Sequence, residues 1–308
     1  RLSLVGSEMC IRDRLYCNYR RYLRNFKPDI VIASSTYPLD IYPAYRIARH
    51  YHAKLIYEVH DLWPLSPMEL GGYSKKHPFI RIMQKAEDDC YRYADAVVSM
   101  LPKAEEHMRE HGLTRDKFHY VPNGIVLSDW NNPKGIPEEH GLLLSKLRAE
   151  GKFIVGFAGA HGIANSLYAV IDAVSSLTEQ NVVLVLVGGG QEKENLIKYA
   201  HKKGVTNVYF LLPINKLAIP NLLKEMDVLY IGLQKQSLFR FGISPNKMFD
   251  YMMAAKPIIQ AIDAGNNLVR EADCGIDVEP DNVSEISKAI LALKSMSEEE
   301  RRKLGENG

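Results

Sequence analysis

The chain has 308 residues, of which 46% are hydrophobic and 25% are charged, and this composition excludes disordered, collagen-like and disulfide-scaffold proteins. Its 39 Lys and Arg residues nearly balance its 37 Asp and Glu residues, and the net charge of +2 argues against a dedicated nucleic-acid binder. The longest apolar run, residues 182–187, is far shorter than the roughly 18 residues that a membrane-spanning helix needs. At roughly 150 residues per domain, we expect two domains.

The four cysteines, at positions 10, 17, 90 and 274, show no CxxC spacing and no neighbouring His pair. This distribution argues against a disulfide framework and against a zinc site. A protein of the reducing cytosol fits it best.

Residues 1–14 (RLSLVGSEMCIRDR) match neither a signal peptide nor a regular first strand. One codon choice for residues 8–13, GAG-ATG-TGT-ATA-AGA-GAC, resembles the transposon end used in sequencing adapters. We therefore interpret residues 1–14 as a sequencing-adapter scar, and a native strand followed by a glycine loop is the alternative. On this interpretation the true N-terminus is missing, and the charged final stretch leaves open a cut C-terminus.

From residue 15 onward, the apolar spacing predicts short strands that alternate with helices. The first helix carries its apolar face on Leu15, Tyr19, Tyr22, Leu23 and Phe26. In the first half, strands are predicted at residues 30–34, 54–59, 96–100 and 118–121, with helices at 39–51, 79–93 and 102–111.

Residues 125–151 lack a strong period and contain two Pro and two Gly before Leu142, so we interpret them as a connection between domains. Further strands are predicted at residues 153–158, 182–187, 208–212, 228–233, 257–262 and 275–278. Continuous Val/Ile/Leu strands between helices predict parallel sheets covered on both faces, and hence an α/β fold with two Rossmann-like domains. We place these domains at residues 15–135 and 136–308, with a ligand cleft between them.

Residues 239–259 (FRFGISPNKMFDYMMAAKPII) contain a helix start with an unusual charge. Ser244 suits the N-cap, and Pro245 suits the first helical position. Lys247 then lies in the first turn, where the helix dipole disfavours a cation unless an anion is bound. Asp250 lies on the same side and could accept hydrogen bonds from a sugar diol. A surface Lys–Asp pair is the alternative, and the residues alone leave both interpretations open.

Two glycine-rich segments follow predicted strands, at residues 159–162 (GAHG) and 188–190 (GGG). Neither matches GxGxxG, although either could let the backbone approach a diphosphate. We favour a binding role for the first segment because His161 adds a donor. For the triple glycine we favour a tight turn that requires positive φ.

The segment YEVHDLWP, residues 57–64, ends a predicted strand with polar groups. His60 lies at the carboxyl end of that strand, and its neighbours Glu58 and Asp61 favour a role in a cleft over a structural role. Nearer the N-terminus, Arg20, Arg21 and Arg24 form a basic helix face that is either a solvated surface or a contact for anionic lipid.

The motifs at residues 58–64 (EVHDLWP), 122–124 (PNG), 159–162 and 244–252 (SPNKMFDYM) together resemble glycosyltransferase family 4. The likeness extends from residue 15 to the end of the chain and is strongest to bacterial surface-polysaccharide enzymes, including transferases of the fucosamine type. The resemblance implies the GT-B architecture, with two Rossmann-like domains facing across a cleft and the first domain incomplete. It also implies a retaining, nucleotide-sugar-dependent enzyme.

The resemblance further implies roles for individual residues. Asp250, where many members carry Glu, would bind the donor ribose, and Lys247 with Arg240 would neutralise the diphosphate. The motif's second acidic position falls on Gly242, which leaves the donor sugar to backbone amides around residues 243–246. The implied donor-binding residues are Gly159, His161, Gly162, Pro213, Ile214, Arg240, Ser244, Asn246, Lys247 and Asp250, and the implied catalytic residue, acting in positioning or stabilisation, is His60.

The implied reaction moves a sugar from a UDP-sugar or similar donor to a lipid-linked or saccharide acceptor, with retention, in the synthesis of O-antigen, capsule or exopolysaccharide. The helix N-terminus and nearby cationic side chains, rather than a metal, would stabilise the charge of the leaving group, so we expect no cofactor and no metal. We also expect no nucleic-acid partner, a cytoplasmic location and peripheral contact with the inner membrane, and the truncated chain could be inactive.

Three alternatives remain. A nucleotide-sugar 2-epimerase of GT-B fold would need several acidic and His residues in the cleft, and the SPNK segment argues against it. A non-catalytic, two-lobed small-molecule binding protein gives no reason for Lys247 in a first helical turn. A Rossmann dehydrogenase is disfavoured because GxGxxG is missing.

Overall fold

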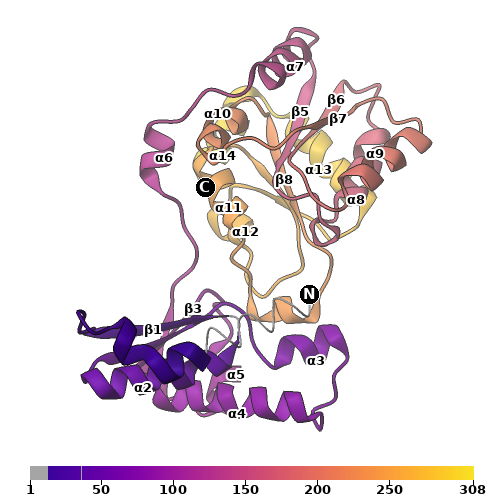
Figure 1. Cartoon of the computed structure of the whole chain (residues 1–308). Helices are drawn as coiled ribbons and strands as arrows, with labels where there is room; N and C mark the ends of the chain where they lie inside the picture. Colours follow the sequence, from indigo (N-terminus) through magenta and orange to yellow (C-terminus); the bar gives the residue numbers. More distant parts are fainter. Residues whose placement is uncertain (1–12, 36) are drawn as a thin grey trace. The chain divides into compact units, whose positions relative to one another are not determined.

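The computed structural model describes residues 13–35 and 37–308 (Figure 1). The chain divides into two compact units, one of residues 1–122 with 240–244 and the other of residues 123–239 with 245–308. Of the suspected adapter stretch, only residues 13 and 14 are described, and they belong to a helix that runs to residue 22. The predicted apolar face of this helix is only partly covered: Tyr19 is buried, whereas Tyr22 and Phe26 are 60% and 63% exposed.

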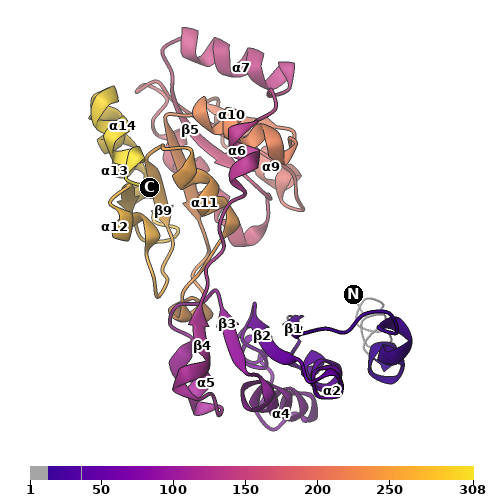
Figure 2. The same ribbon diagram turned by 90° about the vertical axis from the view of Figure 1, so that its left-hand side faces the viewer.

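The first unit contains a parallel sheet in the order β1-β2-β3-β4. Its strands are β1 (Ile30–Ser35), β2 (Lys54–Val59), β3 (Ala96–Ser99) and β4 (Phe118–Tyr120). Its helical segments are η1 (Pro38–Asp40), α2 (Ile41–Tyr51), α3 (Leu65–Gly71), α4 (Pro78–Tyr93), α5 (Glu105–Glu110) and η2 (Arg115–Lys117). α2 and α4 lie on the same side of the sheet (Figure 2). The sequence predicted all four strands but not α3, a short helix without any fully buried residue.

The second unit contains a six-stranded parallel sheet. Its strands are β5 (Phe153–Ala158), β6 (Val182–Val187), β7 (Val208–Leu211), β8 (Val228–Gly232), β9 (Ile258–Ala261) and β10 (Gly275–Asp277). Its first helical segments are α6 (Leu127–Asn131), α7 (Glu138–Ala149), η3 (Ile163–Asn165), α8 (Leu167–Ser175), α9 (Lys193–Lys202) and η4 (Lys216–Ala218). The others are α10 (Ile219–Lys224), η5 (Ser237–Phe241, whose last two residues belong to the first unit), α11 (Asn246–Met253), α12 (Leu268–Ala272), α13 (Val283–Ser295) and α14 (Glu298–Glu306).

Two layers of helices enclose this second sheet. α8, α9 and α13 cover one face, and α10 and α11 cover the other (Figure 1). The order β7-β6-β5-β8-β9-β10 is that of the doubly wound dinucleotide-binding fold, in which the chain reverses its direction of travel between β5 and β8. The predicted α/β fold with two parallel-sheet domains is therefore confirmed, and ligands of such sheets bind beyond the carboxyl ends of the strands at the reversal.

The stretch that we interpreted as a connection between domains contains two helices, α6 and α7, although its sequence lacks a strong period. α7 buries His140, Leu144 and Leu147, which are spaced by four and three residues on one helix face. Gly141 and the 65% exposed Leu142 interrupt the pattern and hid it in the sequence. The sequence placed the domain boundary after residue 135, and the two units divide after Pro122.

Candidate functional site

The two glycine-rich segments that follow β5 and β6 pair with each other through their backbones. Gly159 N donates to Val187 O at 3.0 Å, and His161 N donates to Gly189 O at 2.7 Å. A Cβ on Gly188, whose φ is +151°, would lie only 1.9 Å from Gly159 O. The triple glycine therefore has the positive φ that we expected, and it also permits the close approach of the first segment.

The His161 side chain points into the core of the second unit. It is fully buried, with its ring 6.0 Å from that of Phe157 and 6.4 Å from that of Phe210. Neither ring nitrogen has a hydrogen-bond partner among the described residues. Burial first, and then the charges of Lys193 and Lys247, lower its pKa to about 4. This arrangement corrects our expectation that the imidazole is a donor for a diphosphate.

The first turn of α11 starts one residue later than predicted. Pro245 is the N-cap, without a side-chain cap bond, and the helix begins at Asn246. The predicted N-cap role of Ser244 is therefore wrong, and this buried serine is grouped with the first unit. The prediction that Lys247 lies in the first turn is confirmed, and Asn246 beside it is exposed.

The Lys247 ammonium is enclosed beside the first glycine segment. Its Nζ lies 4.6 Å from the ring centroid of Phe157, and it donates a hydrogen bond to Asn165 Oδ1. Nζ also lies 3.5 Å from the position that a Cβ on Gly159 would occupy. Burial lowers the pKa of Lys247 to about 8, and no carboxylate among the described residues pairs with it. An enclosed cation without an anionic partner favours the binding of an anion.

Tyr251 fixes α11 to the end of β5. Its buried hydroxyl accepts a hydrogen bond from Ala158 N at 2.9 Å. Because Ala158 directly precedes Gly159, this bond holds the first turn of α11 next to the glycine segment. The packing of α11 thus sets where the Lys247 backbone lies relative to the glycine segment.

Asp250 lies one turn after Lys247 and meets a residue of the connecting segment. The Trp130 indole of α6 donates a hydrogen bond to its carboxylate. Burial raises the pKa of Asp250, against the lowering effects of Trp130 and of the nearby Lys216 charge. A partly buried carboxylate of this kind can accept hydrogen bonds from hydroxyl groups.

The loop after β7 completes the group around the glycine segments. Pro213 Cγ lies 3.8 Å from the position of a Cβ on Gly189, and Ile214 follows it with intermediate exposure. Lys193 Nζ donates to Gly188 O at 2.8 Å and to Leu211 O at 2.6 Å, and so connects the ends of β6 and β7. The second unit therefore brings Lys247 next to Gly159 and Pro213 next to Gly189, beyond the carboxyl ends of β5, β6 and β7, while Asn246 and Asp250 lie with Lys247 on α11.

In the first unit, His60 directly follows β2, as predicted. Its Nε2 lies 3.0 Å from Ser34 Oγ of the neighbouring β1 and 3.5 Å from Glu58 Oε2. The side chain is 38% exposed, so the imidazole is open to solvent at the carboxyl end of the sheet. A hydroxyl, an imidazole and a carboxylate in this arrangement can bind a polar group of a ligand or move a proton.

Arg240 belongs to the first unit and is already paired there. Its Nη1 and Nη2 donate to Glu69 Oε2 at 2.9 Å and to Glu69 Oε1 at 2.6 Å. This bidentate pair occupies the guanidinium that we had assigned to a donor diphosphate.

Three residues around the site were not predicted from the sequence: Asn165, Lys193 and Trp130. Asn165 contacts a residue 82 positions away, and Trp130 lies in the stretch that showed no period. Lys193 left a weak signal, because it follows the triple glycine at the start of a helix.

Two family profiles match the chain. The profile described as "Glycosyl transferase 4-like domain" matches residues 12–124, and that described as "Glycosyl transferases group 1" matches residues 144–308, more than half of the chain. Within the residues that the structure describes, no helix is both long and apolar enough to cross a membrane.

A curated relative is the putative teichuronic acid biosynthesis glycosyltransferase TuaH of Bacillus subtilis, which is 24% identical over 215 residues. The match covers 67% of this chain and 50% of TuaH, so the chain spans about half the length of that relative.

Two solved structures share the fold. Anabaena Alr3699/HepE in complex with UDP-glucose has a TM-score of 0.66 at 16% identity, with 95% of this chain and 75% of that chain covered. A glycosyltransferase from Rickettsia africae has a TM-score of 0.68 at 16% identity, with 96% and 76% covered.

Proposed function

Because the chain belongs to the glycosyl transferases group 1 family, we propose that it transfers a glycosyl unit from a UDP-sugar to a saccharide or lipid-linked acceptor. The observation that carries this proposal is the enclosed Lys247 ammonium, which lies beside Gly159 in the first turn of α11 without a carboxylate partner. A donor diphosphate supplies the missing anion. The UDP-glucose bound to HepE, a protein of the same fold, supports uridine as the base.

In the proposed reaction, the bond between the anomeric carbon and the β-phosphate oxygen breaks, and UDP leaves with the electron pair. The acceptor hydroxyl oxygen forms the new bond on the same face of the sugar, with retention, and its proton is released. Lys247 stabilises the charge that develops on the leaving diphosphate, and Asp250 accepts hydrogen bonds from the ribose. The loop residues Pro213 and Ile214 contact the base.

His60 is assigned to positioning or stabilising the transferred sugar, since its imidazole is solvent-accessible and held by Ser34 and Glu58. A role in bacterial cell-surface polysaccharide synthesis is supported by the similarity to TuaH, whose name refers to teichuronic acid. Such acceptors are carried on lipids at the cytoplasmic face of the membrane, and we place the protein there.

Peripheral membrane contact is assigned to the helix at residues 13–22 and the turn after it. Arg20, Arg21 and Arg24 are exposed, and the large apolar side chains of Tyr22 and Phe26 are exposed beside them. Basic and aromatic side chains together favour anionic lipid surfaces. Sedimentation with phosphatidylglycerol vesicles, and not with phosphatidylcholine vesicles, is expected, and an Arg20→Ala/Arg21→Ala/Arg24→Ala variant should lose it.

The donor site is tested by calorimetry of the full chain with UDP, GDP and ADP. We expect UDP to bind best, and Lys247→Ala to weaken it about 10- to 100-fold, as the loss of a charge-assisted hydrogen bond implies. Asp250→Ala should remove the preference for UDP over 2′-deoxy-UDP. Lys198→Ala, at an exposed lysine of α9, is the matched control and should bind like wild type. Equal affinity of wild type and Lys247→Ala would refute the site.

Turnover and stereochemistry need a separate measurement. Incubation with UDP-sugars and saccharide acceptors, followed by NMR of the product's anomeric proton, should show the same configuration as in the donor. An opposite configuration would overturn retention alone. Formation of a C2-epimeric sugar without an acceptor would instead support the epimerase alternative.

A further inference from the structure

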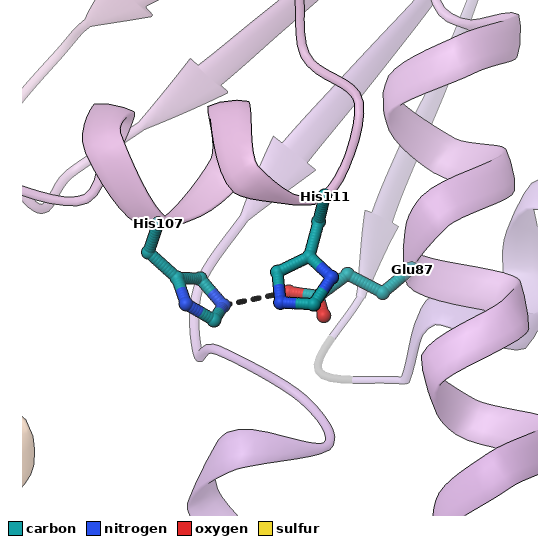
Figure 3. Close-up of side chains that lie close together, drawn as sticks. All are labelled: Glu87, His107 and His111. Carbon is teal, nitrogen blue, oxygen red and sulfur yellow. Dashed lines mark hydrogen bonds and ion pairs between the residues drawn. The ribbon is translucent and has the colours of Figure 1, made fainter.

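Two histidines, one on α5 and one directly after its end, approach a glutamate of α4 in the first unit (Figure 3). His107 lies on α5 (Glu105–Glu110), and His111, four residues later, is the C-cap residue of that helix. The imidazole nitrogens and a Glu87 carboxylate oxygen provide three atoms that all lie within 4.8 Å of one another. His107 Nε2 and Glu87 Oε1 are 3.4 Å apart.

Glu87 is a buried carboxylate with little compensation for its charge. It is 1% exposed, and its oxygens accept hydrogen bonds from Tyr91 OH at 2.9 Å and from Gln84 Nε2 at 2.8 Å. No Lys or Arg among the described residues forms an ion pair with it, and its ionic contact is with His107. A buried carboxylate in this environment is costly unless a cation pairs with it.

The polar contacts around the cluster outnumber the protons that are available to form hydrogen bonds there. Gln84 Nε2 lies 2.8 Å from Glu87 Oε2, 3.0 Å from Asp88 Oδ1 and 2.8 Å from His111 Nδ1, yet an amide nitrogen carries only two protons. His111 Nδ1 also lies 3.1 Å from Asp88 Oδ1. If this nitrogen donates to Asp88, it cannot accept from Gln84, so one contact is unsatisfied in either tautomer. A cation bound by the acceptors removes this shortage.

The cluster is accessible from a cavity of about 860 Å³ within the same unit, lined by residues of α3, α4 and α5 together with Arg240. The side chains of His107 and His111, which line it, are 12% and 27% exposed. An ion could therefore enter, and water could occupy a fourth coordination position.

From these observations we propose that Glu87, His107 and His111 bind a divalent transition-metal ion, with Zn²⁺ the best fit, and that the ion links α4 to α5. Two imidazoles and one carboxylate form a ligand set that Zn²⁺ prefers, with an open fourth position. Zinc–ligand distances of about 2.0–2.2 Å place tetrahedral ligand atoms roughly 3.4 Å apart, as His107 Nε2 and Glu87 Oε1 already are. The spacing of the cysteines argued against a zinc site, but this site contains no cysteine and depends on a His pair from another part of the chain.

The test uses the full chain with Cys10 and Cys17 replaced by Ser, because Cys17 is an exposed free thiol. The protein is stripped with EDTA, titrated with Zn²⁺ in competition with a chromophoric chelator, and analysed for bound zinc by mass spectrometry. We expect one equivalent of zinc and a higher melting temperature in its presence.

His107→Gln and His111→Gln, made separately, should each weaken zinc binding by at least about 10-fold and abolish the rise in melting temperature. Both variants keep the hydrogen bonds that Tyr91 and Gln84 donate to Glu87, so circular dichroism should show them folded without zinc. His119→Gln, at an exposed histidine of β4, is the control and should behave like wild type. No stoichiometric zinc in the wild type, or a zinc affinity in either cluster variant equal to that of the wild type, would overturn the site.

Discussion

The two sheets of this protein arise from similar alternations of strand and helix, but the strands of the second unit are more completely buried than those of the first. Every residue of β5, β6 and β8 in the second unit is buried. In the first unit, β2 and β3 alternate between more and less buried positions, and Ile30 and Ile32 of β1 are 55% and 59% exposed. Alternation of strands and helices thus predicts parallel pairing of the strands. An unbroken apolar run, such as VVLVLV in β6, predicts in addition that both faces of the strand are buried.

The same contrast extends to the functional groups. In the second unit, the glycine segments approach each other through their backbones, His161 is fully buried and Lys247 is half-buried. In the first unit, His60 and Arg240 form side-chain pairs that are partly exposed. Substitutions of these groups should therefore have larger effects on stability in the second unit than in the first.

The largest effect is expected for Gly188→Ala. A Cβ at this position would lie 1.9 Å from Gly159 O, and the φ of +151° is strained for an L-residue, so the second unit should lose about 3 kcal/mol or more of stability. The chain has two tryptophans, so Trp130 fluorescence in a Trp63→Phe background follows denaturant unfolding of the second unit alone.

Gly204→Ala is the matched control for Gly188→Ala. Its φ of +67° is also left-handed, but a Cβ there would meet nothing within 4 Å. It should cost only about 1 kcal/mol, the backbone penalty alone. Equal losses in the two variants would show that the close approach of the glycine segments contributes nothing.

The features that could be predicted from the sequence are those that short, continuous segments of the chain determine. The strands, the first-turn position of Lys247 and the strand-end position of His60 depend on neighbours within a few residues. The burial of His161 could not be predicted, because it depends on pairing with a glycine segment almost thirty residues later. The contact between Trp130 and Asp250 likewise joins distant segments, and Glu87 on α4 lies about twenty residues before the two histidines of its cluster.

His161 should make the second unit sensitive to acid. Its pKa falls from 6.5 to about 4 on folding because of burial, so between these values the unfolded chain binds more protons. Stability should decrease as the pH falls from 6.5 to 4, by up to about 3 kcal/mol. His161→Leu should remove this slope at little cost at pH 7, since neither ring nitrogen has a partner to leave unpaired.

The check is urea unfolding at pH 7, 6, 5 and 4, and His201→Gln, at an exposed histidine of α9, should retain the wild-type slope. An unchanged slope in His161→Leu would mean that the imidazole reaches water when it is protonated.

Lys247, whose ammonium donates a hydrogen bond to Asn165, should act at the alkaline end. Its pKa falls from 10.5 to about 8 through burial, so the unfolded chain binds more protons between these values, and stability should rise from pH 8 to 10.5. UDP affinity should fall over the same range as the ammonium loses its proton. Lys247→Met should abolish both trends, and Lys198→Met should abolish neither. A UDP affinity that stays constant to pH 10 would exclude Lys247 from the diphosphate site.

The smallest effect on stability is expected in the first unit, at the pair of Arg240 and Glu69. Their side chains are 48% and 22% exposed, so water screens the pair, and a double-mutant cycle with Arg240→Met and Glu69→Gln should give a coupling of about 0.5–1 kcal/mol. The same variants decide whether Arg240 also binds the donor. If the guanidinium stays with Glu69, Arg240→Met leaves UDP affinity unchanged. If Arg240→Met weakens UDP and Glu69→Gln strengthens it, the ion pair competes with the diphosphate for one guanidinium, and the exposed pair then controls donor binding despite its small contribution to stability.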